Sequence, residues 1–172
     1  MLFVLSHLAF CSECVRRVRM LEALGGTLIE GAGETRLARV TAESVLDELE
    51  RRASCAWTPK LSAAIGPIVD VLPLPLAPYV AVRAAGWRRS QPGVERLELE
   101  PGRLELVRVE TETHGPEHEH AAGDFTLVLE GEIADDALRF RRGDVLSCDA
   151  GTRHAPATAR GTICLRLTER TD

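Results

Sequence analysis

The spacing of apolar residues changes near the middle of this 172-residue chain, and this change restricts the fold most strongly. Up to about residue 72, apolar residues recur with the three-to-four-residue period of helices. From Trp87 onward, apolar and polar residues alternate with a period of two, between turns rich in Gly, Pro and Asp. We therefore expect an α+β protein, with a small N-terminal helical domain followed by an antiparallel sandwich or small barrel.

The helical part is predicted to contain three helices. The first runs from near the N-terminus to the glycine pair 25–26, where a glycine C-cap would end it. Thr41 is the expected N-cap of a second helix over 41–53. A third helix over 59–72 contains Pro67, which should bend or break it.

A proline-rich run over 72–78 is the expected boundary between the two parts. We predict a helical domain over 1–73, a linker over 74–90 and a barrel domain over 91–172. The barrel strands are expected where alternation is regular, at 94–100, 103–112, 125–133, 137–148 and 161–169.

Composition excludes several classes of protein. The net charge of −5 comes from 21 basic and 26 acidic residues without a polybasic block, so direct nucleic-acid or membrane binding is not expected. The apolar opening MLFVLSHLAF is too short to span a membrane and lacks the basic start of a signal peptide. Five cysteines, an odd number, indicate a reducing compartment and metal or redox use. We expect a cytoplasmic protein.

One set of candidate metal ligands lies near the N-terminus. His7, Cys11 and Cys14 form a His-x3-Cys-x2-Cys run, which on one helix spans an arc of roughly 60°. Two thiolates and an imidazole suit structural zinc, although this run supplies three ligands where such sites use four. The alternative is that these side chains only pack in an apolar helix face.

A second set lies in the barrel half. His118 and His120 are two residues apart, so both point to the same side of an extended segment, and Asp124 follows. His154 comes after a short strand and a glycine-containing turn. Three imidazoles and a carboxylate suit zinc, iron(II), manganese or nickel, and the ligand types do not choose between them. The alternative is that these histidines are solvated loop residues.

The barrel half resembles the cupin fold in both of its motifs. The first, His-x-His-x3-acid-x6-Gly, matches His118, His120, Asp124 and Gly131. The second, Gly-Asp followed by a turn glycine and a histidine, matches Gly143, Asp144, Gly151 and His154. Cupins mostly carry Glu at the position of Asp124, whose side chain is one methylene shorter.

The order of the two motifs resembles the ChrR-type zinc-binding anti-sigma factors over nearly the whole chain. The resemblance implies a helical domain that wraps an extracytoplasmic-function sigma factor and blocks its access to RNA polymerase. It also implies a cupin domain that helps sense a reactive-oxygen signal of oxidative stress. If the metal ligands of that family are transferred to the matching positions here, His7, Cys11 and Cys14 would hold a structural zinc. The ligands of the cupin metal would be His118, His120, Asp124 and His154.

One feature departs from that family. Its members supply a fourth ligand about two dozen residues upstream of the His-x3-Cys-x2-Cys run, whereas six residues, none of them a ligand type, precede His7. Either the true start lies upstream of Met1 and a first helix is missing, or the site is incomplete, or another donor such as Cys55 takes part.

Three functions follow from these patterns. The first is an anti-sigma factor without catalytic residues, whose helices 41–53 and 59–72 present apolar stripes to a partner, unless the stripes pack against each other. The second is a metal-dependent cupin enzyme of the dioxygenase type. The third is a cupin ligand-sensing module without the partner surface. Cys148 and Cys164 are more simply core residues than redox targets, and a homodimer is compatible with the sequence.

Overall fold

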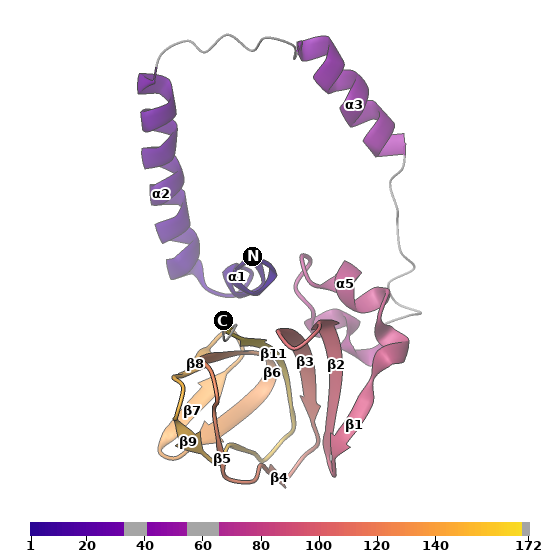
Figure 1. Ribbon diagram of the computed structural model, residues 1–172, viewed down its shortest axis with the longest axis vertical. Coiled ribbons are helices and arrows are strands. Elements are labelled where there is room, and N and C mark those ends of the chain that lie inside the picture. The colour runs from indigo at the N-terminus through magenta and orange to yellow at the C-terminus, as the bar shows by residue number, and fades with distance from the viewer. Residues whose placement is uncertain (33–40, 55–65, 170–172) are drawn as a thin grey trace. The chain divides into compact units, whose positions relative to one another are not determined.

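The computed structural model describes residues 1–32, 41–54 and 66–169 (Figure 1). The chain divides into two compact units. One consists of Met1–Ser12 together with Lys60–Asp172, and the other is Glu13–Pro59. Antiparallel strands follow N-terminal helices, so the predicted α+β class is confirmed. No helix within the described ranges is both long enough and apolar enough to cross a membrane.

The first predicted helix is two helices, α1 at Leu2–Leu8 and α2 at Ser12–Gly31. The chain turns between them because the backbone N–H groups of Phe10 and Cys11 both donate to the carbonyl of His7, at 2.9 and 3.1 Å. The predicted end at the glycine pair 25–26 is wrong. Neither glycine has a positive φ, so no left-handed cap forms there, and the helix continues despite a cost of about 1 kcal/mol for each glycine.

The helix predicted after Thr41 is confirmed as α3, Ala42–Ser54. The N–H of Ser44 donates to Thr41 Oγ1 at 3.1 Å, and the N–H of Thr41 donates to Ser44 Oγ at the same distance. These reciprocal bonds satisfy donors that the first turn of a helix leaves open.

The third predicted helix is described only in its last part. Residues 55–65, which include Cys55, lie outside the described residues, and Gly66–Val71 forms a 3₁₀ helix, η1. The proline-rich run leads into α5 at Ala77–Ala81 and a short 3₁₀ turn, η2, at Ala84–Gly86. Leu76 and Val80 are fully buried in the same core as the sheet, so part of the predicted linker is packed structure.

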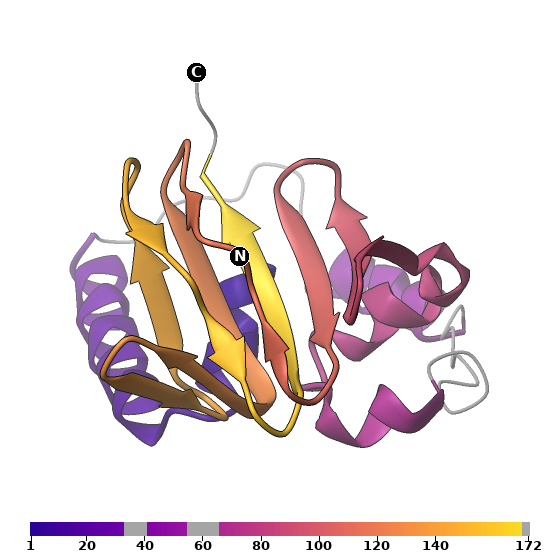
Figure 2. The ribbon, with the colours of Figure 1, turned by 90° about the horizontal axis from the view of Figure 1, so that it is seen from below.

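Eleven strands follow in the described residues, and every pairing between them is antiparallel (Figures 1 and 2). They are β1 Arg88–Gln91, β2 Val94–Glu100, β3 Leu104–Val109, β4 Thr113–His114, β5 His118–Glu119, β6 Asp124–Asp135, β7 Leu138–Arg141, β8 Val145–Cys148, β9 Arg153–His154, β10 Ala157–Thr158 and β11 Thr162–Thr168. The main sheet runs in the order β1-β2-β3-β11-β6-β10-β4, with β7 and β8 also paired to β6. β5 and β9 form a separate two-stranded sheet.

A row of leucines crosses the main sheet. Leu165 of β11 lies opposite Leu106 of β3 on one side and Leu127 of β6 on the other, and Leu97 of β2 lies opposite Leu106. All four side chains are almost completely buried. The alternation that predicted these strands therefore arises because one face of the sheet is the core.

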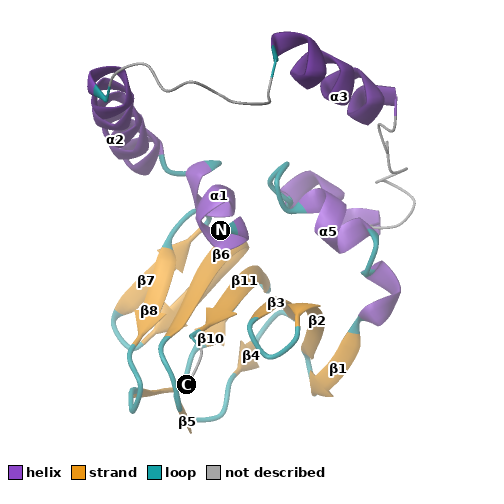
Figure 3. Cartoon of the chain, turned by 45° about the horizontal axis from the view of Figure 1, so that its top comes forward, coloured by secondary structure: helices purple, strands orange, loops and turns teal. Residues whose placement is uncertain are grey.

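Helix α1 packs on the sheet through aromatic side chains. Phe3 is buried in the same core, and its ring lies 6.4 Å from that of Phe125 in a tilted contact. The guanidinium of Arg142 lies 5.0 Å from the centre of the Phe10 ring. Figures 1 and 3 place α1 at one end of the curled sheet and β4 and β5 at the other.

The leucine row makes a testable contribution to stability. Leu165→Ala should lower the free energy of unfolding by about 2–5 kcal/mol, because it removes buried methyl groups and leaves a cavity between two strands. Leu138→Ala, at a site that is 62% exposed, should change it by no more than about 0.5 kcal/mol. Urea unfolding followed by circular dichroism measures both, and equal effects would contradict this account of the core.

Candidate metal centres

Strand pairing brings the barrel histidines together. β5 and β9 pair with His118 directly opposite His154. The ladder continues past β5, because the N–H of His120 donates to the carbonyl of Thr152 at 3.0 Å and the N–H of Gly151 donates to the carbonyl of His120 at 2.7 Å. This short ribbon therefore presents three imidazoles from two segments that are more than thirty residues apart.

The three rings converge through their Nε2 atoms. His154 Nε2 lies 2.8 Å from His120 Nε2 and 3.1 Å from His118 Nε2. Two zinc–nitrogen bonds at a tetrahedral angle would place their nitrogens about 3.3 Å apart, so this spacing is close to that of a shared ion. His120 and His154 are buried, whereas His118 is exposed.

The opposite ring nitrogens have their own partners. His118 Nδ1 donates to the carbonyl of Pro116 at 3.1 Å, and His154 Nδ1 donates to the carboxylate of Asp135 at 3.0 Å. Because carbonyls and carboxylates only accept, the neutral rings keep their proton on Nδ1 and leave a lone pair on Nε2. Facing lone pairs repel one another, and a cation between them would turn this repulsion into ligation.

His120 has no such direct partner among the described residues, but its charge state also favours ligation. Burial lowers the pKa of the His120 imidazole most, and His154, His118 and Arg166 lower it further, while Asp124 opposes the shift. The neutral ring, which is the form that binds metals, is therefore favoured.

The structure does not bring Asp124 into the group of converging atoms. Its Oδ2 accepts from Arg166 Nε at 2.6 Å and from Thr168 Oγ1 at 3.2 Å. The same oxygen lies 3.9 Å from His120 Nδ1, the nitrogen that faces away from the other two histidines. Asp124 thus lies behind one histidine, and its predicted role as a direct ligand stays a prediction.

Two cysteines near the site are buried thiols. Burial raises the pKa of Cys148, and the carboxylates of Asp124 and Asp135 raise it further. Complete burial raises the pKa of Cys164 to about 12, although a hydrogen bond with Thr162 acts in the opposite direction. Both thiols are therefore protonated at neutral pH, which agrees with the expectation that they are core residues.

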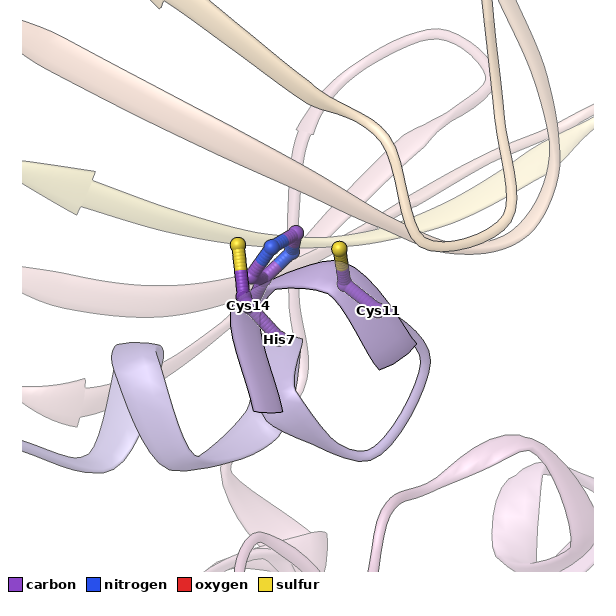
Figure 4. A group of neighbouring side chains, drawn as sticks. All are labelled: His7, Cys11 and Cys14. Atoms are coloured by element: carbon purple, nitrogen blue, oxygen red, sulfur yellow. The ribbon is translucent and has the colours of Figure 1, made fainter. Parts of the chain in front are cut away.

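The N-terminal set also forms a group (Figure 4). His7 lies in the last turn of α1, Cys11 lies in the connection between the helices, and Cys14 lies in the first turn of α2. Their ligand atoms lie within 4.8 Å of one another, and all three residues are half-buried. The three side chains point to the same side in Figure 4, although the predicted single helix is interrupted between α1 and α2. The hydrogen bonds from the N–H groups of Phe10 and Cys11 to the carbonyl of His7 keep Cys11 close to His7.

A cavity of about 350 Å³ opens beside the three barrel histidines. Its walls are mostly apolar side chains of the sheet, and Asp124, Arg96 and Arg166 also line it. Its volume lies at the lower end of the range for small-molecule sites, which is about 300–1,000 Å³.

Comparisons with known proteins agree with this arrangement. Residues 77–171 match the family described as the ChrR cupin-like domain. The chain belongs to this family. Anti-sigma-E factor ChrR of Cereibacter sphaeroides is 33% identical to it over 171 residues, covering 96% of this chain and 78% of that protein. The crystal structure of Rhodobacter sphaeroides SigE in complex with the anti-sigma ChrR matches 97% of this chain and 87% of the other, at 29% identity and a TM-score of 0.71.

Membership of the ChrR family confirms the resemblance, the cupin fold and the order of the two parts. Sequence reasoning missed the residues behind the histidines, chiefly Asp135 and Arg166. Asp135 stands at the end of β6, and only the folded register places it beside His154. No spacing rule in the sequence identifies it.

The contact between Asp135 and His154 leads to a prediction about metal affinity. Asp135→Asn should weaken metal binding in the barrel about 10–100-fold, because the amide no longer orients and polarises the imidazole. Asp136→Asn changes the adjacent, exposed side chain and should leave the affinity unchanged. Competition with a chromophoric chelator measures both variants. Equal affinity in Asp135→Asn and the unmodified chain would show that this carboxylate does not support the site.

Proposed function

We propose that this protein is an anti-sigma factor that binds an extracytoplasmic-function sigma factor through its helices. It carries metal ions in both of its candidate centres. The observation that carries this proposal is the apolar surface of α2 and α3, which the described residues leave uncovered.

Helix α2 has no buried residue along its 20 residues. Five large apolar side chains between residues 20 and 29 are 62–76% exposed, and most follow helical spacing along one side. They are Met20, Leu21, Leu24, Leu28 and Ile29. Exposed apolar surface of this extent is typical of an interaction site in a soluble protein.

Helix α3 repeats the pattern over a shorter length. Val45, Leu46 and Leu49 lie at i, i+1 and i+4, and they are 44–59% exposed. The alternative that the stripes of 41–53 and 59–72 pack against each other stays untested, because residues 55–65 lie outside the described residues. The apolar sides of α2 and α3 therefore suit helices of a partner, in the manner of a helix bound along a groove.

The relatives support the same partner. The crystal structure that aligns with nearly all of this chain contains the anti-sigma ChrR in complex with SigE. For this chain we infer a sigma factor of the same class, and an action in the cytoplasm, where such a partner meets RNA polymerase. The response to reactive oxygen that the resemblance implies belongs to the same proposal.

The donor sets suggest different ions. Two thiolates and an imidazole from Cys11, Cys14 and His7 favour zinc in a structural role, and the described residues leave the identity of a fourth donor open. The barrel group offers three imidazole nitrogens, which suit zinc and equally iron, manganese or nickel.

A second candidate function is a metal-dependent cupin enzyme of the dioxygenase type. The cavity beside the three histidines favours it, because an ion there would have room for a small substrate. An enzyme function would not explain the exposed apolar stripes of α2 and α3, whereas sigma-factor binding does.

The α2 stripe tests the proposal. Leu24→Asp combined with Leu28→Asp should weaken binding to an extracytoplasmic-function sigma factor of the same organism by about 100-fold or more, since each buried leucine contributes about 1.5–3 kcal/mol. Isothermal titration calorimetry measures the dissociation constant.

The matched control is Glu22→Gln. Glu22 is exposed and lies about 160° around the helix from Leu24, so this variant should bind as the unmodified chain does. Full binding by the double variant, or an equal loss in the control, would overturn the proposed surface. Oxygen uptake by the iron-loaded chain with a small organic substrate would instead favour the enzyme.

A further inference from the structure

We propose that α2 binds its partner as two helical segments joined by a hinge at Gly25 and Gly26. The first segment is residues 12–24 and the second is residues 27–31, so the partner surface that they fit is bent. This shape rests on the proposed function, in which α2 contacts a sigma factor.

The glycine pair lies in the interior of a solvent-exposed helix. Figure 1 shows α2 as one continuous helix, and none of its residues is buried, so no core holds it straight. A Cβ added at Gly25 or Gly26 would meet no atom within 4 Å beyond the helix's own backbone. Packing in the described chain therefore does not require glycine here, although each glycine makes the helix about five-fold less stable than alanine would. What the pair provides is backbone freedom.

Thr27 weakens the same turn of the helix. Its Oγ1 donates to the carbonyl of Ala23 at 3.0 Å, and in a regular helix this carbonyl accepts the N–H of Thr27. A hydroxyl that bonds back in this way tends to bend a helix at that turn. Two glycines and a back-bonded threonine are consecutive, so they place a weak turn between residues 23 and 27.

The two segments on either side of this turn differ in their own stability. In the first segment, Glu13 pairs with Arg16 and Arg17, three and four residues further along the helix. Such pairs stabilise an exposed helix. The second segment is little more than one turn long, and an isolated helix of that length is unstable in water. It is therefore the second segment that moves about the glycines.

The apolar side chains before and after the glycines face different directions. Met20, Leu21 and Leu24 lie before the pair, and Leu28 and Ile29 lie after it. At about 100° per residue, the mean direction of the second group is roughly 80° around the helix from that of the first. A straight α2 cannot turn both groups fully toward one surface. A hinge lets the second segment rotate until both groups contact the partner.

Hydrogen–deuterium exchange of the free, full chain tests the hinge without a partner. Amides of residues 27–31 should exchange at least about ten-fold faster than those of residues 18–22, because the second segment opens more readily. In the double variant Gly25→Ala with Gly26→Ala, exchange of residues 27–31 should slow by about ten-fold. This comparison separates the effect of the glycines from ordinary fraying of a helix end. Equal rates in the two segments, or no slowing in the variant, would overturn the hinge.

The binding test uses the same double variant and an extracytoplasmic-function sigma factor of the same organism. Isothermal titration calorimetry should give about ten-fold weaker binding than for the unmodified chain, because alanine restricts the bend although it stabilises the helix. Circular dichroism checks that the variant is folded. The matched control is Gly31→Ala, the same substitution beyond the last exposed apolar residue of α2, and it should bind as the unmodified chain does.

Unchanged or tighter binding by the double variant would overturn the hinge, because a straight α2 would then fit the partner. An equal loss in Gly31→Ala would also overturn it, since the loss would then follow from any stabilised helix. An unmodified chain that does not bind the sigma factor would instead overturn the proposed function. The exchange rates of the free chain report on the hinge separately from that result.

Discussion

The rest of the barrel depends on the pairing of β11 with β3 and β6 through buried leucines. β11 lies between these strands, and Leu165 meets a leucine on each side. The register that this packing selects also positions polar groups, because a slip by one residue would turn every side chain to the other face. Arg166, the next residue, reaches Asp124 on β6 only in this register.

Strand β6 connects the sheet to the candidate metal centre. Asp124 begins the strand and Asp135 ends it. One carboxylate lies behind His120 and the other accepts from His154, so the two ends of a single strand help to fix two imidazoles. Apolar packing in the sheet therefore sets the geometry of the polar groups around the candidate metal centre.

The sequence predicted the parts of this arrangement that depend on local spacing. Alternation identified the main strands, and the two histidine motifs identified the rings that converge. Asp135 could not be found in this way, because its contact with His154 joins residues 19 positions apart through strand pairing. The hydrogen bond from Arg166 to Asp124 joins residues 42 positions apart, so no sequence motif could predict it either.

Local sequence patterns gave two wrong predictions of where helices end. A glycine pair at 25–26 resembles a helix end, but the flanking residues are good enough helix formers to continue α2 to Gly31. The break after Leu8 contains no Gly or Pro, the residues that most often mark the end of a helix. The ligand group survives because the turn brings Cys11 back toward His7.

We propose that α2 and α3 form the surface that binds a sigma factor. Hydrogen–deuterium exchange of the full chain, alone and with the extracytoplasmic-function sigma factor, tests it most directly. Binding should slow the exchange of the amides in α2 and α3 and leave the strands β2, β3, β6 and β11 unchanged. Protection confined to the barrel strands, or no protection in either helix, would contradict it.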